Sequence, residues 1–90
     1  NIQNEISATY AELVNLQTMI VQQQSAVNSY RRLLEAEILN LELGESNLFQ
    51  INFQQDRLIE SQSKLLSLET KFEVSKAKLL WSAGVPNLQF

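Results

Sequence analysis

The side chains that could do chemistry in this chain are carboxylates, hydroxyls and amides, because its 90 residues include no His and no Cys. The commonest general base, the commonest metal ligands and the thiol nucleophile are therefore missing. Two carboxylate pairs are closely spaced, Glu35 with Glu37 and Glu69 with Glu73. On a helix the first pair points to different sides, and the second shares a face among lysines, which is typical of a solvated surface. We expect no enzymatic activity, no metal and no cofactor.

Charge and hydropathy exclude two further classes of partner. Glycine-rich phosphate-binding motifs do not occur, and the net charge of −3 argues against binding to nucleic acid. No apolar run approaches the roughly 20 residues that a membrane-spanning helix needs, so we expect that this segment does not span a membrane. The chain starts at Asn1 without an initiator Met, and we interpret it as a piece of a longer protein.

Two amphipathic helices are predicted by apolar residues at seven-residue spacing. These residues are Ile6, Leu13, Ile20, Val27, Leu34 and Leu41 in the first half, and Ile51, Leu58, Leu65, Phe72 and Leu79 in the second. Strict seven-residue spacing predicts that a helix supercoils against another helix. The companion rows are mostly polar: Tyr10, Gln17, Gln24, Arg31 and Ile38, then Leu48, Gln55, Gln62, Glu69 and Lys76. Further apolar residues lie beside these rows, namely Val14, Leu16, Val21, Tyr30, Ile59, Leu66, Leu68, Val74 and Leu80. We therefore expect each helix to contact more than one neighbour.

The turn between the helices is marked by Gly44, because glycine commonly ends a helix in the left-handed conformation. Ser46 and Asn47 follow, and either can cap a new helix; if Asn47 is the cap, Gln50 lies three residues on, as in a capping box. Gly84 and Pro86 predict the end of the second helix. The expected fold is all-α, an antiparallel two-helix coiled-coil hairpin in one domain, 1–90. Its helices span about 5–43 and 48–83, with the turn at 44–47 and a tail at 84–90.

Two aromatic residues beside the turn have two interpretations. Phe49 and Phe53 lie one helical turn apart. They could anchor a partner, or they could pack across the hairpin onto Leu39 or Leu41. The sequence favours neither interpretation.

The turn and the second helix resemble the C-terminal part of TolC-family outer-membrane efflux proteins. The resemblance rests on Leu43-Gly44-Glu45-Ser46-Asn47-Leu48-Phe49-Gln50-Ile51-Asn52, on Leu58-Ile59-Glu60, and on the closing Leu79-Leu80-Trp81-Ser82-Ala83-Gly84. Upstream, Glu5-Ile6-Ser7-Ala8-Thr9-Tyr10-Ala11-Glu12-Leu13 is similar to the opening of the helix that precedes the turn in that family. The resemblance covers nearly all of residues 5–84.

This resemblance implies a periplasmic hairpin of a channel-tunnel, part of a larger α-helical barrel in a homotrimeric outer-membrane protein. In the family, hairpin tips dock onto the helical hairpins of a periplasmic adaptor (membrane fusion) protein, which links the tunnel to an inner-membrane pump for efflux or secretion. By that analogy the partner-binding tip consists of Leu43, Gly44, Glu45, Ser46, Asn47, Leu48 and Phe49. We also expect self-association through exposed lateral residues such as Val14, Val21, Ile59 and Leu66.

One departure concerns the gate. Known members narrow the entrance with acidic residues on the returning helix, whereas the matching positions here are Gln50 and Phe53, with Leu41 and Ser46 opposite. The family's gate is therefore not carried over. Gln50 and Phe53 are candidate pore-facing residues, and Phe53 or Glu45 could replace the acidic constriction.

Two other functions are compatible with the pattern. The chain could be the helical hairpin of an adaptor protein, although adaptors typically carry an Arg-Leu-Ser-type tip in place of Gly44-Glu45-Ser46. It could also be a structural coiled-coil hairpin without a docking role. A purely structural turn should tolerate Gly44→Asn and changes at Leu43 with little functional loss.

Overall fold

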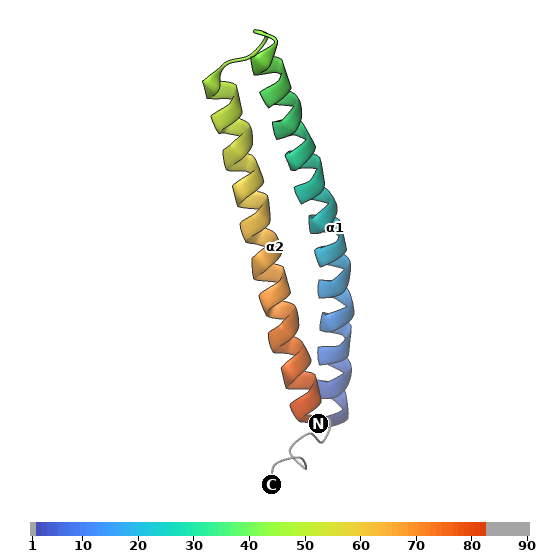
Figure 1. The fold of residues 1–90 in the computed structure, drawn as a ribbon. Coiled ribbons are helices and arrows are strands. Elements are labelled where there is room, and N and C mark those ends of the chain that lie inside the picture. The colour runs from blue at the N-terminus through green and yellow to red at the C-terminus, as the bar shows by residue number, and fades with distance from the viewer. Residues whose placement is uncertain (1, 83–90) are drawn as a thin grey trace. The chain divides into compact units, whose positions relative to one another are not determined.

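The computed structural model describes residues 2–82 and contains two long helices (Figure 1). Helix α1 spans Ile2–Glu42 and helix α2 spans Leu48–Ser82, with no strand in the part of the chain that is described. The expected all-α, antiparallel hairpin is confirmed. Helix α1 begins about three residues earlier than expected. The predicted stop at Gly84 and Pro86, and the tail at 84–90, lie outside the described residues.

The chain divides into two compact units, which we describe separately. The tip unit is Val21–Leu66 and contains the turn; the terminal unit combines Asn1–Ile20 with Ser67–Phe90. Within each unit, a segment of α1 and a segment of α2 lie side by side and run in opposite directions (Figure 1). The seven-residue apolar row is buried or half-buried throughout both units, as its spacing predicted. We call it the first seam row.

A second seam row completes the interface, and it differs from the companion row predicted from the sequence. Its members follow the first row by three residues and are buried or half-buried: Thr9, Leu16, Gln23, Tyr30 and Glu37 on α1, and Gln54, Ser61, Leu68 and Ser75 on α2. The predicted companions, which follow the first row by four residues, are exposed: Tyr10, Gln17, Gln24, Arg31, Ile38, Leu48, Gln55, Gln62, Glu69 and Lys76. That prediction was wrong. The first row alone cannot decide between the two spacings, because both lie on the same side of a helix.

Polar side chains in the seam are bonded across it or to the helix itself. In the tip unit, Gln23 Nε2 donates to the carbonyl of Ser61 at 2.9 Å. In the terminal unit, Ser75 Oγ donates to a carboxylate oxygen of Glu12 at 3.1 Å. Ser61 Oγ donates to the carbonyl of Leu58 at 2.8 Å. No buried side-chain nitrogen or oxygen in the described residues lacks a hydrogen-bond partner, as the cost of burying an unbonded polar group requires.

The turn has the hydrogen bonds of a Schellman motif. Gly44 adopts a φ of 78°, and its N–H donates to the carbonyl of Leu41 at 3.0 Å. The N–H of Glu45 donates to the carbonyl of Asn40 at 2.7 Å. These two bonds satisfy carbonyls that the end of α1 would otherwise leave unbonded. The predicted role of Gly44 as the left-handed C-terminal residue of the first helix is confirmed.

Substitution of Gly44 should reveal this backbone constraint. A Cβ at Gly44 would meet nothing within 4 Å, so a cost would come from the backbone conformation and not from a clash. We expect Gly44→Ala to lower the free energy of unfolding by about 1–2 kcal/mol, and Gly44→Asn by less, because Asn visits the left-handed region more readily. Urea denaturation followed by circular dichroism measures both. An alanine variant as stable as the wild type would contradict this account of the turn.

The second seam row predicts a contrast between two leucines of the terminal unit. Leu68 is 5% exposed, whereas Leu80 is 50% exposed. We expect Leu68→Ala to lower the free energy of unfolding by about 2–3 kcal/mol through lost burial and the cavity left behind. Leu80→Ala, the matched control on the same helix, should change it by about 0.5 kcal/mol or less. Equal effects in thermal unfolding would mean that Leu68 does not belong to the seam.

Candidate partner-binding tip

The tip is held in one conformation by bonds at both ends. On the α1 side are the two Schellman bonds of Gly44 and Glu45. On the α2 side, Asn47 Oδ1 accepts the N–H of Gln50 at 2.9 Å, which confirms Asn47 as the N-terminal cap. Ser46 Oγ bonds a carboxylate oxygen of Glu37, which belongs to the second seam row. The turn is therefore tied to α1 by a side chain as well as by its backbone.

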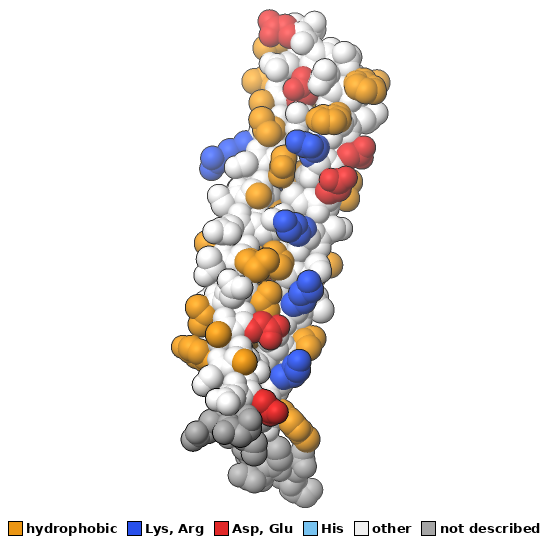
Figure 2. Space-filling view, turned by 180° about the vertical axis from the view of Figure 1, so that it is seen from behind, with side chains coloured by type: hydrophobic (Ala, Val, Ile, Leu, Met, Phe, Trp, Pro, Cys, Tyr) orange, Lys and Arg blue, Asp and Glu red, His pale blue; other side chains and the backbone are white. Residues whose placement is uncertain are grey.

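The apolar side chains of the tip point into solvent. Leu43 is 64% exposed, Leu48 68% and Phe49 76%. Large apolar side chains are comparably exposed elsewhere in each unit, for example Val21 at 60% and Tyr10 at 61%, so the tip is one of several exposed apolar surfaces. Acidic and hydrophobic side chains share the surface at the end of the tip unit that holds the turn (Figure 2). A partner could therefore make apolar contacts with the tip and lie close to its acidic side chains.

The two aromatic residues beside the turn behave differently. Phe49 is 76% exposed, which argues against packing across the hairpin onto Leu39 or Leu41. Phe53 is half-exposed, and its ring lies 5.3 Å from the guanidinium carbon of Arg57. Gln50 is exposed beside the cap. Their predicted place at a pore stays a prediction.

Glycine 44 leaves open space on the outside of the turn. Because nothing lies within 4 Å of the place where a Cβ would stand, a partner's backbone could approach Gly44 closely. Glu45 is exposed next to it, and Ser46 is half-buried through its bond to Glu37. Of the seven predicted tip residues, Ser46 alone is turned toward the hairpin, so it is a supporting residue and not a contact residue.

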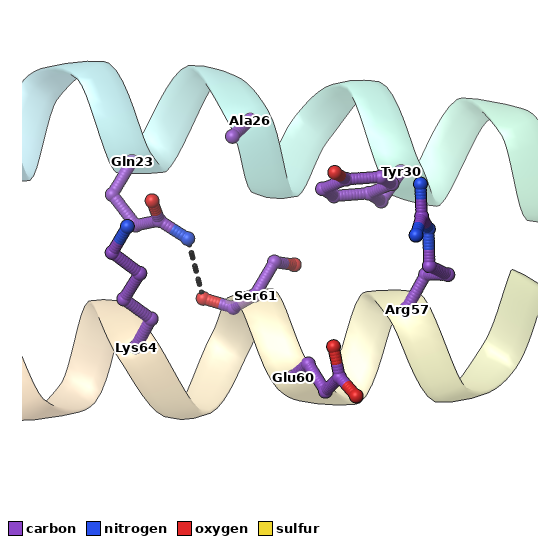
Figure 3. A pocket seen from close by; sticks show the side chains of 7 residues that line it. All are labelled: Gln23, Ala26, Tyr30, Arg57, Glu60, Ser61 and Lys64. Atoms are coloured by element: carbon purple, nitrogen blue, oxygen red, sulfur yellow. Dashed lines mark hydrogen bonds between the residues drawn. The ribbon is translucent and has the colours of Figure 1, made fainter.

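A polar notch interrupts the seam of the tip unit (Figure 3). It has a volume of about 260 Å³ and is lined by Gln23, Ala26 and Tyr30 of α1 and by Arg57, Glu60, Ser61 and Lys64 of α2. Arg57 reaches across to α1, where its guanidinium carbon lies 5.7 Å from the centre of the Tyr30 ring. This distance allows a cation–π interaction. Sequence reasoning missed both this contact and the Gln23–Ser61 bond.

Glu60, Ser61 and Lys64 line the notch, and the hydroxyl of Ser61 donates to the main-chain carbonyl of Leu58. Within residues 2–82, no group of three or more acidic side chains is placed to hold a metal ion. The same range contains no helix that is long and apolar enough to cross a bilayer.

Comparisons with known protein families, with curated proteins and with solved structures find no match for this chain.

The Ser46–Glu37 contact should be measurable as a coupling between the turn and α1. We expect Ser46→Ala to lower the free energy of unfolding by about 1 kcal/mol, because it removes a hydrogen bond to a charged group at a partly exposed site. In a Glu37→Ala background the same substitution should cost nearly nothing. A double-mutant cycle in urea isolates the pairwise energy. Additive losses from the two substitutions would show that the contact does not stabilise the turn.

Proposed function

We propose that this chain is a periplasmic α-barrel hairpin of a TolC-like outer-membrane channel-tunnel, and that its tip docks onto a periplasmic adaptor protein. The observation that carries the proposal is the exposure of Leu43, Leu48 and Phe49 on a turn held by backbone and side-chain bonds. A surface of this kind suits binding, because burial of its apolar side chains against a partner is favourable and its backbone needs little ordering.

The resemblance of residues 5–84 to that family supplies the identity of the partner. In the family, the helical hairpin of the adaptor meets the turn that Leu43, Gly44, Glu45 and Ser46 form here. The open space outside Gly44 supports a close approach of two backbones. The exposed flanks support the proposal in a second way: Val14 and Val21 on α1 and Ile59 on α2 are all exposed, as residues that meet neighbouring helices of a trimer would be in an isolated hairpin.

A structural hairpin without a partner would make different use of the same residues. Its turn would need Gly44 for conformation and Ser46 for support, but it would gain nothing from the exposed Leu48 and Phe49. Exposed apolar residues lower solubility, so they are retained where they bind. The exposure of Leu48 and Phe49 at the tip therefore favours docking over a purely structural role.

Docking should be lost when the tip is changed and should survive an equivalent change elsewhere. The chain, fused to a trimerising domain, is titrated with the helical hairpin of a periplasmic adaptor from the same organism. We expect Leu43→Ser to weaken binding about tenfold or more, as for the removal of a central apolar contact. Leu33→Ser is the matched control: it removes an exposed leucine of the same helix away from the turn, and binding should be unchanged.

Gly44→Trp tests the close approach. It should abolish binding while circular dichroism shows that both helices persist, because the introduced ring fills the open space outside the turn. Absence of binding by the trimerised wild type would argue for a structural hairpin. Equal binding by the wild type and Gly44→Trp would mean that a partner contacts the helix flanks, and the assignment of the tip would be wrong.

A further inference from the structure

Over three successive levels, the second seam row carries polar and apolar residues in the same order on both helices. On α1 the order is Thr9, Leu16, Gln23, and on α2, which runs the opposite way, it is Ser75, Leu68, Ser61. The bond from Gln23 to the Ser61 carbonyl places these two residues at the same level of the tip unit. At these three levels each polar residue has a polar residue at the matching position of the other helix, whereas the next level toward the turn pairs Tyr30 with Gln54 and does not follow the pattern.

The same matching holds in the terminal unit. In that unit the bond between Ser75 and Glu12 places Ser75 close to the level of Thr9 and Glu12, so Leu68, seven residues before Ser75, lies close to the level of Leu16. Leu16, Leu68 and Ser75 are buried and Thr9 is half-buried, as members of a common seam should be. Ser75 is also bonded to α1 through Glu12, three residues from Thr9.

The first seam row does not distinguish one register of the two helices from another. All its members are Ile, Leu, Val or Phe, so a displacement of α2 by seven residues would again bring apolar residues together. In the second row, that displacement would bring Leu68 opposite Gln23 and Ser75 opposite Leu16. Each mismatch would set a leucine that is now buried, Leu16 or Leu68, against a polar side chain, and part of its apolar burial would be lost.

We propose that the alternating second seam row sets the register of the hairpin and so positions the residues of the tip. Leu16 and Gln23 on α1, with Ser61 and Leu68 on α2, are its positioning residues. Polar residues at core positions are known to select register in coiled coils at some cost in stability. Gly44 ends α1, whereas the second row decides which residues of α2 lie opposite α1.

The register matters for the tip because it determines where α2 begins. In the displaced register, Ile51 would face Leu41, seven residues beyond its present partner position, Leu34. In the present register Leu48 lies at the level of Glu37, whose carboxylate bonds Ser46, whereas in the displaced register it would lie at the level of Gly44 and that bond would be broken. This consequence for docking rests on the function proposed above; the register itself does not.

An exchange of two residues tests the proposal without changing the composition. In the variant Leu16→Gln with Gln23→Leu, the displaced register brings the new amide opposite Ser75 and the new leucine opposite Leu68. The native register now carries both mismatches. We expect this exchange to shift the hairpin toward the displaced register, whereas a general loss of packing would lower stability without favouring any one alternative.

Cysteine crosslinking reads the register directly, because the chain contains no Cys of its own. Val27→Cys with Leu58→Cys reports the native register, and Val27→Cys with Leu65→Cys reports the displaced one. In the otherwise unchanged chain, the first pair should react with a short bifunctional thiol reagent at least tenfold faster, counted in the monomer band. In the exchange variant, the ratio of the two rates should fall at least tenfold.

A compensating exchange keeps the test decisive even if the first variant loses helix content. Ser61→Leu with Leu68→Ser, added to the α1 exchange, matches the two rows again in the native register, and the native crosslink should regain its preference. As a control, Gln17→Val with Val21→Gln exchanges two exposed residues and should leave the ratio unchanged.

An unchanged ratio in the α1 exchange, or no recovery in the combined exchange, would overturn the proposal and leave the turn as the determinant of register. The adaptor titration tests the proposed function and is independent of the crosslinking experiment. Failure of the wild type to bind would contradict the proposed function, and the crosslinking result would stand on its own.

Discussion

Each unit of this protein depends on the burial of one narrow seam between two antiparallel helix segments. Only four apolar side chains are buried among the described residues: Leu16, Val27, Leu58 and Leu68. A seam with so little fully buried apolar surface gains limited free energy from burial, and every polar group that it contains must find a partner. The Gln23–Ser61 and Ser75–Glu12 bonds meet that requirement, one in each unit. Packing and hydrogen bonding therefore act together in the seam.

The parts of the fold that depend on local chemistry could be predicted from the sequence. Seven-residue spacing identified the first seam row, Gly44 identified the turn, and Ser46 and Asn47 were the two candidates for the cap of α2, because each effect is decided within a few residues. The second seam row depends on the partner helix. Ser61 and Gln23 resemble solvated positions until they are seen opposite each other, and the row at a spacing of four residues, itself mostly polar, was predicted in place of the row at three. Comparing both possible spacings on the two helices for matching polarity would have found it.

The candidate site was predictable in position but not in detail. The seven tip residues could be named from the turn signals and from the resemblance. The exposure of their side chains could not be predicted, because Phe49 could have folded back onto Leu39, and Ser46 could have faced solvent. The Ser46–Glu37 bond joins residues nine positions apart around a turn, and no local rule predicts it. The pairing of Arg57 with Tyr30 likewise requires the two helices to be placed first.

The seam and the tip are parts of one arrangement. Glu37 belongs to the second seam row, and its bond to Ser46 continues that polar row into the turn. Two Schellman bonds and the Asn47 cap then fix the backbone from Asn40 to Gln50. A partner that contacts Leu43, Leu48 and Phe49 would meet side chains on a backbone that is already ordered, and would avoid much of the entropic cost of ordering a flexible loop.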